Sequence, residues 1–360
     1  MKNAKFHLAL FLVAFLFLTP AIVFLSEHGG ILPDEKRKKA DVPSLPDKIR
    51  HGSVKKLFQE FDSFFSDHFP LRGPFLQKIS SFYQAVGHNF DFNRCYRGKA
   101  NWLFLGNYYA QTVSKLQMDI VPTQAHIDAT IKPYADLAAA CEKDGVELVL
   151  VVGPNKSGIY KEYLPPVIHP SQKRYADFFL QPLEQIPGLR LCDAKEALMS
   201  AKADGALLYY RPDTHWNLRG SRVAFEGVRS ILSLPPLPAH QLVNDGKRHG
   251  DDLIDIAKLK NFPVSADDAY TLTWEKPLPL AITKKDNITT VLNPESASEK
   301  TVWTLGDSFM YALQDYIYAS FRKTTDFGHL DHILPNISEI LKYSPEKPDV
   351  ILIIGVERRF

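Results

Sequence analysis

Residues 146–152 read VELVLVV, a run of apolar and largely β-branched residues that follows a helical pattern at 123–143. A strand that is apolar at almost every position is typical of a parallel sheet covered on both faces. Further short apolar runs lie between helical stretches at 189–192, 206–210, 301–305 and 350–354. This alternation predicts an α/β fold, a three-layer α/β/α sandwich with a mainly parallel sheet.

Composition divides the rest of the chain. Residues 26–50 are charged and contain prolines, and this composition predicts a linker. We expect residues 51–360 to form the globular domain. Within this domain, the stretch 234–300 has many prolines and only a weak pattern of apolar residues. We interpret that stretch as an irregular insertion or an antiparallel extension of the sheet.

The N-terminus carries an uncharged apolar run at 8–25, preceded by Lys2 and Lys5. As a helix this run would extend about 27 Å, enough to cross the hydrocarbon core of a membrane. No small-residue cleavage site follows it, so we expect a signal anchor at 1–25, with 6–25 spanning the membrane, rather than a cleaved signal. Both alternatives export the domain. Basic residues at 36–39 oppose this orientation, but the two lysines lie closer to the span.

Charge and cysteine content narrow the possible functions. The 360 residues include 43 Lys and Arg against 41 Asp and Glu, a net charge of +2, with no basic stripe. This balance argues against a nucleic-acid partner. Cys95, Cys141 and Cys192 lack the spacing of metal ligands, so we expect no metal and no cofactor. One pair of these cysteines could form a disulfide.

Two short segments contain residue types that nucleophilic catalysis needs. Asp213 and His215 follow the apolar run at 206–210, and Ser308 follows the run at 301–305. Loops at the carboxyl ends of parallel strands meet at one edge of the sheet. A serine becomes a nucleophile when a base takes its proton, and a carboxylate orients the base. We therefore predict Ser308 as nucleophile, His215 as base and Asp213 as its partner.

Each segment alone also has an ordinary structural explanation. Gly-Asp-Ser before a helix can be a simple cap, and Asp-Thr-His can be a turn beside an exposed histidine. The presence of both segments, each after a predicted strand, favours the catalytic interpretation.

Four further residues are candidates for substrate binding. Lys156 and Arg211 could bind the carboxylate of an anionic polymer or could simply be solvated. Asn155 could assist the backbone N–H of Ser308 in an oxyanion hole, or could be a turn residue. Trp216 could stack on a sugar or belong to the core.

These segments resemble a known family. Gly306-Asp307-Ser308 is similar to the serine block of the SGNH hydrolase-like superfamily, and Asp213-Thr214-His215-Trp216 resembles the signature of its alginate O-acetyltransferase branch, the AlgJ/AlgX-like family. In that branch the Asp-His block precedes the serine block, as it does here. Asn101 stands where the family usually has Gly. The other segments that resemble family elements are 67–72, 98–104, 153–160 and 348–359.

The resemblance implies an exported, membrane-anchored O-acetyltransferase that acetylates hydroxyls of an alginate-like or cellulose-like exopolysaccharide through an acetylated Ser308. It implies a catalytic domain in the periplasm, an anchor in the inner membrane, and a multispanning membrane O-acyltransferase as the acetyl donor. Two alternatives remain open. The same triad would serve a carbohydrate acetyl esterase, and a catalytically silent scaffold could bind polysaccharide or assemble a secretion complex.

Overall fold

The computed structural model describes residues 93–244, 246, 250–259, 262–263 and 265–360, together with positions 31–32, 37–38, 40–41, 60, 62–64 and 68. The predicted anchor at 6–25 lies outside the described residues, as does most of the predicted linker. None of the helices within the described part of the chain combines the length and the apolar character that a membrane span requires.

The chain forms two units. One consists of Met1–Phe90 and Ile254–Phe262, and the other consists of Asp91–Leu253 and Pro263–Phe360. The first unit contains an antiparallel pair of short strands, β1 (Ile31–Leu32) and β2 (Arg37–Lys38). The second unit contains the main sheet and all the residues predicted for the site.

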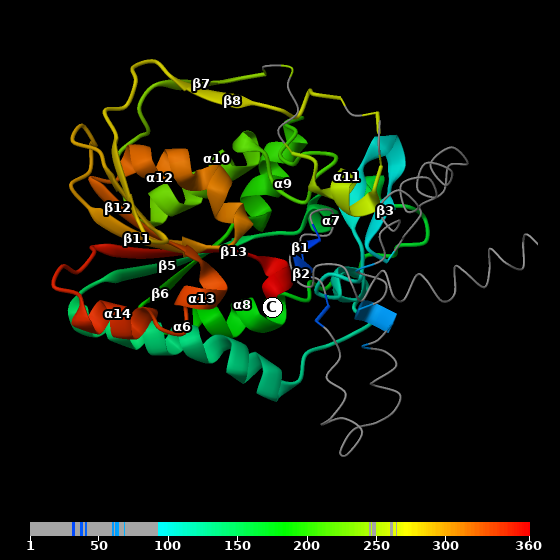
Figure 1. Cartoon of the computed structure of the whole chain (residues 1–360), viewed down its shortest axis with the longest axis horizontal. Coiled ribbons are helices and arrows are strands. Elements are labelled where there is room, and N and C mark those ends of the chain that lie inside the picture. The colour runs from blue at the N-terminus through cyan, green and yellow to red at the C-terminus, as the bar shows by residue number, and fades with distance from the viewer. Residues whose placement is uncertain are drawn as a thin grey trace, which may run out of the picture. The chain divides into compact units, whose positions relative to one another are not determined.

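A seven-stranded sheet with the order β6-β5-β13-β11-β12-β10-β9 organises the second unit (Figure 1). The first five strands in this order run parallel, whereas β10 and β9 join antiparallel. The mainly parallel sheet is therefore confirmed. The strand bounds are β5 (Glu147–Gly153), β6 (Leu189–Asp193), β9 (Ala281–Lys285), β10 (Ile288–Leu292), β11 (Thr301–Gly306), β12 (Lys323–His329) and β13 (Val350–Val356).

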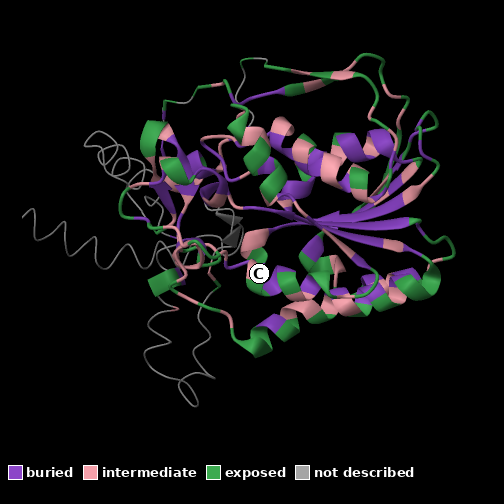
Figure 2. Ribbon diagram, turned by 180° about the vertical axis from the view of Figure 1, so that it is seen from behind, coloured by how far each residue is buried: buried purple, intermediate pink, exposed green. Residues whose placement is uncertain are grey.

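Helices cover both faces of this sheet, as Figure 1 shows. On one face lie α6 (Gln124–Asp144), α8 (Asp177–Glu184) and α14 (Ile337–Tyr343); on the other lie α9 (Lys195–Ala203), α10 (Leu218–Ile231) and α12 (Gln314–Ser320). Alternate residues of β5 point to opposite faces: Val149 and Val151 belong to one apolar cluster, and Leu148 and Leu150 to the other. The central strands are consequently buried throughout (Figure 2), which explains their unbroken apolar sequences.

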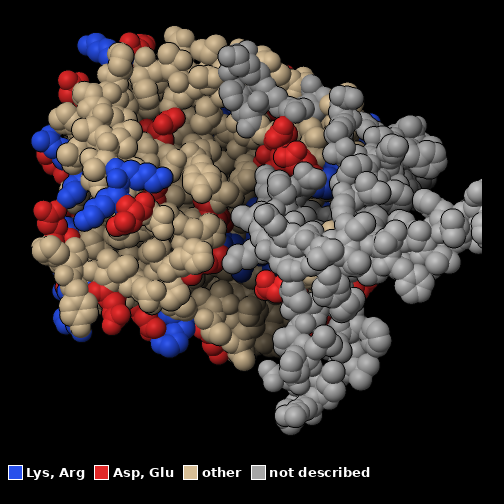
Figure 3. All heavy atoms as spheres, viewed as in Figure 1, with Lys and Arg blue, Asp and Glu red and all other residues tan. Residues whose placement is uncertain are grey.

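Shorter elements surround the sheet. They include two antiparallel strand pairs, β3 (Cys95–Arg97) with β4 (Leu103–Leu105) and β7 (His240–Val243) with β8 (Thr271–Trp274). The short helices are α5 (Thr112–Gln117), α7 (Lys156–Ile159), α11 (Asp252–Ala257), α13 (Leu330–Ile333), η1 (Lys99–Asn101), η2 (Lys161–Tyr163), η3 (Ser308–Leu313) and η4 (Glu357–Arg359). On the face drawn in Figure 3, acidic and basic groups of the described residues intermingle.

Local sequence accounts for the helix ends. Thr123 caps α6 by accepting a hydrogen bond from the backbone N–H of His126 at 3.2 Å, and Gly145 ends it with φ 69°. Asn217 caps α10 by accepting from two backbone N–H groups at 3.0 Å each. In η1, Asn101 has φ 61°. Asn tolerates this left-handed conformation better than most residues.

The prediction of a strand at 206–210 is wrong. Only an isolated bridge joins Tyr209 to Trp216 there. Leu208 and Tyr209 are buried in the core, so the run is apolar because its side chains pack, without strand pairing. The cysteines Cys95, Cys141 and Cys192 are all buried free thiols, and burial raises the pKa of Cys141 and of Cys192 to about 12.

Candidate active site

The turn that carries Ser308 is shaped by its two preceding residues. Gly306 ends β11 where a Cβ atom would lie 2.8 Å from the carbonyl oxygen of Ile354, so a side chain is excluded. The carboxylate of Asp307 accepts the backbone N–H of Phe309 at 2.9 Å and that of Val356 at 2.8 Å. Asp307 therefore caps η3 and ties it to the end of β13, which leaves Ser308 half-buried at the start of η3.

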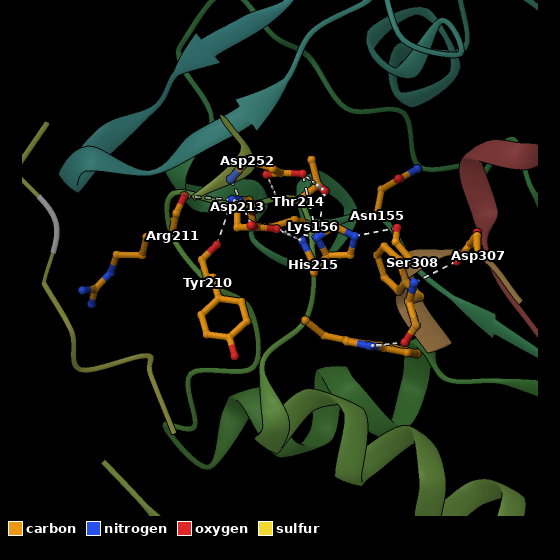
Figure 4. A network of polar contacts seen from close by, with 12 residues as sticks. Asn155, Lys156, Tyr210, Arg211, Asp213, Thr214, His215, Asp252, Asp307 and Ser308 are labelled. Carbon is orange, nitrogen blue, oxygen red and sulfur yellow. Dashed lines mark hydrogen bonds and ion pairs between the residues drawn. The ribbon is translucent and has the colours of Figure 1, made fainter. Parts of the chain in front are cut away.

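The structure brings together three predicted side chains (Figure 4). The Nε2 atom of His215 lies 2.6 Å from Oγ of Ser308, although 93 positions separate the two residues. The Nδ1 atom of His215 lies 2.5 Å from Oδ1 of Asp213. The His215 side chain is 24% exposed and that of Asp213 is 8% exposed, so an incoming group can reach the imidazole while the carboxylate stays shielded. Such a relay can remove a proton from the hydroxyl and return it later.

Asp213 is held in its ionised form. Besides the imidazole, it accepts the backbone N–H groups of His215 at 2.9 Å and of Asp252 at 3.0 Å. Burial on its own would raise the pKa of the Asp213 carboxyl, but His215 and these backbone donors outweigh burial and hold the pKa below its usual range. An ionised carboxylate is the state that stabilises a protonated imidazole.

A second carboxylate, Asp252, was not predicted. It accepts the backbone N–H of Thr214 at 2.9 Å and its hydroxyl at 2.7 Å, and its Oδ2 lies 3.8 Å from Nδ1 of His215. Burial raises the pKa of Asp252, and the neighbouring charge of Asp213 adds to this effect. The residue lies in the irregular stretch 234–300, where no motif marked it.

Asp213, His215 and Asp252 also form a group whose ligand atoms lie within 4.8 Å of one another, close enough to surround a cation. Their oxygen and nitrogen atoms are already engaged with each other, with Thr214 and with backbone N–H groups. The arrangement as it stands is that of a hydrogen-bonded relay.

The structure does not support a substrate contact for Lys156. Its side chain is buried, and its ammonium donates to the carbonyl oxygens of Tyr210, Arg211 and Asp213 at 3.0, 2.9 and 2.5 Å. All three N–H groups are used inside the protein, so neither predicted alternative, an anionic ligand or solvent, describes this residue.

Trp216 and Arg211 also have internal partners. Trp216 is fully buried and donates its Nε1–H to the carbonyl oxygen of Phe309 at 3.0 Å, which excludes a sugar platform and agrees with the core alternative. The guanidinium of Arg211 forms two hydrogen bonds with Asp267, at 2.5 and 2.9 Å. Arg211 thus secures its own loop, and a substrate contact there would compete with Asp267.

Unlike Lys156, Trp216 and Arg211, Asn155 keeps a side-chain donor that could contact a bound molecule. Its Oδ1 accepts from Nη1 of Arg358 at 3.2 Å and its backbone N–H donates to Glu357 at 2.7 Å. Asn155, Thr214 and Arg358 line a small cavity beside the relay. Because Arg358 engages Oδ1, the amide is oriented with Nδ2 as the available donor. Arg358 was not predicted as a site residue, although it lies in the closing segment that resembles the family.

A second, larger cavity of about 70 Å³ shares Asn155 and Arg358 in its lining. Most of its charged lining residues are basic. They are Lys115, Lys161, Lys173, Arg174, Lys195 and Arg358, against Glu357. Arg174 pairs with Glu357 and Asp193 and Lys195 pairs with Glu196, so part of this positive charge is neutralised.

Comparisons with known proteins concern the sequence and the fold of this chain. Residues 95–262 match the model of the SGNH hydrolase-like domain of acetyltransferase AlgX. Comparison with curated proteins gave no match. Among solved structures, Bacillus cereus PatB1 is similar with a TM-score of 0.51 and 13% identity, over 73% of this chain and 95% of PatB1.

Two further structures show lower scores. The O-acetyltransferase domain of Pseudomonas putida AlgJ has a TM-score of 0.48 and 17% identity, over 73% of this chain and 91% of that domain. Pseudomonas aeruginosa AlgX has a TM-score of 0.45 and 14% identity, over 74% of this chain and 62% of AlgX. The PatB1 similarity shows a shared fold. Residues 95–262, somewhat less than half of the chain, are thus similar in sequence to the SGNH hydrolase-like domain of acetyltransferase AlgX.

Proposed function

We propose that this protein is an exported O-acetyltransferase that uses Ser308, His215 and Asp213 to acetylate hydroxyls of an exopolysaccharide. The observation that supports this most strongly is the continuous hydrogen-bonded path from the hydroxyl through the imidazole to an ionised, buried carboxylate. Two of the three residues, Asp213 and His215, lie within the segment 95–262 that matches the model of the SGNH hydrolase-like domain of acetyltransferase AlgX.

In the first half of the reaction, Oγ of Ser308 attacks the carbonyl carbon of the acetyl donor while Nε2 of His215 takes the hydroxyl proton. The negative charge that develops on the carbonyl oxygen is stabilised by the backbone N–H of Ser308 and by Nδ2 of Asn155. The imidazolium, held by Asp213, then gives its proton to the leaving group, and the acetyl group remains on Ser308.

In the second half, a sugar hydroxyl enters in place of the leaving group. His215 takes the proton of the sugar hydroxyl while the oxygen of that hydroxyl attacks the acetyl carbon. The proton then returns to Oγ of Ser308 as the new ester departs. A water molecule in the acceptor position would give acetate, which is how an esterase would use the same residues.

The basic cavity favours an anionic acceptor. Lys161 and Lys173 belong to its lining together with Arg358, which lies beside the relay. Ammonium and guanidinium groups pair with carboxylates, so an alginate-like polymer of uronic acids fits this lining better than a neutral, cellulose-like polymer.

The apolar run at 8–25 and the family resemblance support an inner-membrane anchor at 6–25 with the domain in the periplasm. A multispanning membrane O-acyltransferase is the proposed acetyl donor. Cell fractionation tests the location: the full chain should sediment with the inner membrane, and a variant that begins at residue 26 should not.

Replacement of Ser308 by Ala tests the chemistry. The purified protein is mixed with an activated acetyl ester and uronate oligosaccharides, and products are identified by mass spectrometry. Ser308→Ala should lower the rate of oligosaccharide acetylation by about 10⁴-fold, because the relay acts as a unit. The matched control is Ser320→Ala, a buried hydroxyl that bonds only the Tyr316 carbonyl in α12 and should leave the rate intact.

Each other outcome has a defined meaning. Release of acetate without acetylated oligosaccharide would identify an esterase. A Ser308→Ala protein that still acetylates, or an unaltered protein whose Ser308 does not react with a sulfonyl fluoride, would contradict the proposed nucleophile and favour the silent scaffold. The reagent is suitable because PatB1, which shares the fold, has been solved with a sulfonyl adduct.

A further inference from the structure

The most unusual charged group near the relay is the buried ammonium of Lys156, at the first position of α7. Three backbone carbonyls of one short loop accept its three N–H groups at 2.5 to 3.0 Å (Figure 4). These carbonyls belong to Tyr210, Arg211 and Asp213, immediately before His215. A buried ammonium is unfavourable unless its donors are all satisfied, and this loop satisfies them.

Other bonds also hold this loop, since the backbone N–H of Arg211 donates to Asp268 at 2.6 Å and that of Thr214 donates to Asp252 at 2.9 Å. The backbone-to-backbone bonds within the loop are longer. The backbone N–H of Tyr210 donates to the carbonyl of His215 at 3.2 Å, and that of Asp213 donates to the carbonyl of Tyr210 at 3.4 Å, which is long for such a bond. The shortest of the three ammonium bonds, at 2.5 Å, goes to the carbonyl of Asp213 itself. Lys156 thus fixes the backbone of the residue whose carboxylate orients the imidazole.

We propose that Lys156 is a positioning residue for the reaction: through three backbone carbonyls, its ammonium holds the loop of Asp213 and His215 where the imidazole meets Ser308. This inference rests on the proposed function. The three N–H groups of Lys156 are all donated to backbone carbonyls, so it acts through the loop.

The surroundings of Lys156 keep it charged at neutral pH. Burial lowers the pKa of its ammonium to about 8, while the negative charges of Asp213, Asp252 and Asp268 and the nearby thiol of Cys95 oppose this decrease. Aromatic rings complete the enclosure, since the Nζ atom lies 5.6 Å from the ring centre of Trp102 and 5.3 Å from that of Phe104.

Lys156→Met tests the inference, because Met has a similar length and carries no charge or donor. Two properties are measured: the rate at which phenylmethylsulfonyl fluoride labels Ser308, and the downfield proton NMR resonance of His215 Nδ1–H, assigned by its loss in Asp213→Asn. Labelling should slow by about 100-fold, because a displacement of roughly 1 Å at a reacting group has an effect of this size. The resonance should disappear as the proton becomes free to exchange with water.

The matched control is Lys202→Met. The ammonium of Lys202 also donates to a backbone carbonyl, that of Ile159 at 2.6 Å, and lies 4.8 Å from the ring centre of Tyr160, but none of its bonds reaches the loop of His215. This variant should keep both the labelling rate and the resonance. If Lys156→Met also keeps both, the inference is wrong, whereas the absence of labelling in the unaltered protein would contradict the proposed function instead.

If Lys156→Met does not fold, the unaltered protein provides the second measurement. Above about pH 8 the ammonium becomes an amine with two N–H groups, which cannot satisfy three carbonyls. The resonance should then be lost between pH 7 and pH 10 while circular dichroism stays native. A resonance that persists unchanged across this range, in a folded protein, would overturn the inference.

Discussion

His215 faces two carboxylates, and their distances assign them different tasks. Asp213 lies 2.5 Å from Nδ1 and Asp252 lies 3.8 Å from it. Asp213→Asn should lower the acetylation rate by about 10⁴-fold, since an amide can donate a proton to Nδ1 and so favours the wrong tautomer of the base. The measurement is kcat with saturating donor and acceptor, which separates this effect from binding.

Asp252→Asn is the comparison variant. Its amide oxygen can still accept from Thr214, and the pair of His215 and Asp213 stays in place, so kcat should fall by roughly tenfold or less. Equal losses in the two variants would contradict this division and would mean that both carboxylates hold the imidazole.

Residue types and their spacing predicted that Ser308, His215 and Asp213 act together, because nucleophilic catalysis demands a hydroxyl, an imidazole and a carboxylate, and the structure places the three side chains within hydrogen-bonding distance. They were insufficient for Lys156. Whether an ammonium points to solvent or to backbone carbonyls depends on the path of another loop, here at 210–213, and no local pattern records that path. Asp252 was missed because its approach to Thr214 and His215 likewise depends on how a distant segment of the chain folds.

At the scale of elements, the turn at the start of η3 depends on the packing of Phe309 against Trp216, two residues before α10, and against Gly153 at the end of β5. Trp216 donates to the Phe309 carbonyl and its ring lies 4.8 Å from the Phe309 ring, while a Cβ on Gly153 would lie 2.7 Å from that ring. These contacts place the backbone that follows Ser308.

Trp216→Phe should therefore impair the turn rather than substrate binding. The variant leaves the buried carbonyl of Phe309 without this donor, at a cost of about 1 to 3 kcal/mol in the free energy of unfolding. We expect slower labelling of Ser308 and a lower kcat with KM for the oligosaccharide unchanged. A rise in KM alone, with unchanged stability, would restore the interpretation of Trp216 as a sugar platform.

Elements with strong local patterns were predicted well, such as β5, β13 and α6. Two failures have physical causes. Residues 206–210 are apolar because some of their side chains are buried in the core, and a segment can be buried in this way without pairing as a strand. β12, with the sequence KTTDFGH, was not predicted because it has no apolar run; it is held by its neighbours β11 and β10 on either side.

At the scale of the whole molecule, the order of the strands brings the loops of the site to one edge. β11 lies between β13 and β12, and β13 pairs with β5, so Ser308, Asn155 and Arg358 follow strands whose carboxyl ends adjoin. Sequence alone predicted the alternation of strands and helices. The order in the sheet depends on long-range pairing, for which only the family resemblance offered a guide.

Burial of Lys156 also couples the stability of the whole fold to pH. Its pKa is about 8 in the folded protein against 10.5 for an ordinary lysine. Below pH 8 both states bind the proton, and the folded state bears the full cost of burying the charge. Between pH 8 and pH 10.5 the unfolded state binds more protons, so this contribution to the free energy of unfolding rises with pH, by on the order of 3 kcal/mol in total.

Urea unfolding at a series of pH values from 7 to 10 measures this coupling in the unaltered protein and in Lys156→Met. Other groups titrate in both proteins, so the difference between the two curves isolates Lys156. The unaltered protein should gain stability relative to the variant as the pH rises above 8. A difference that stays constant would show that the ammonium keeps its ordinary pKa and that the three carbonyls offset its burial completely. A difference that changes in the opposite direction would show that the folded protein raises this pKa above that of an ordinary lysine.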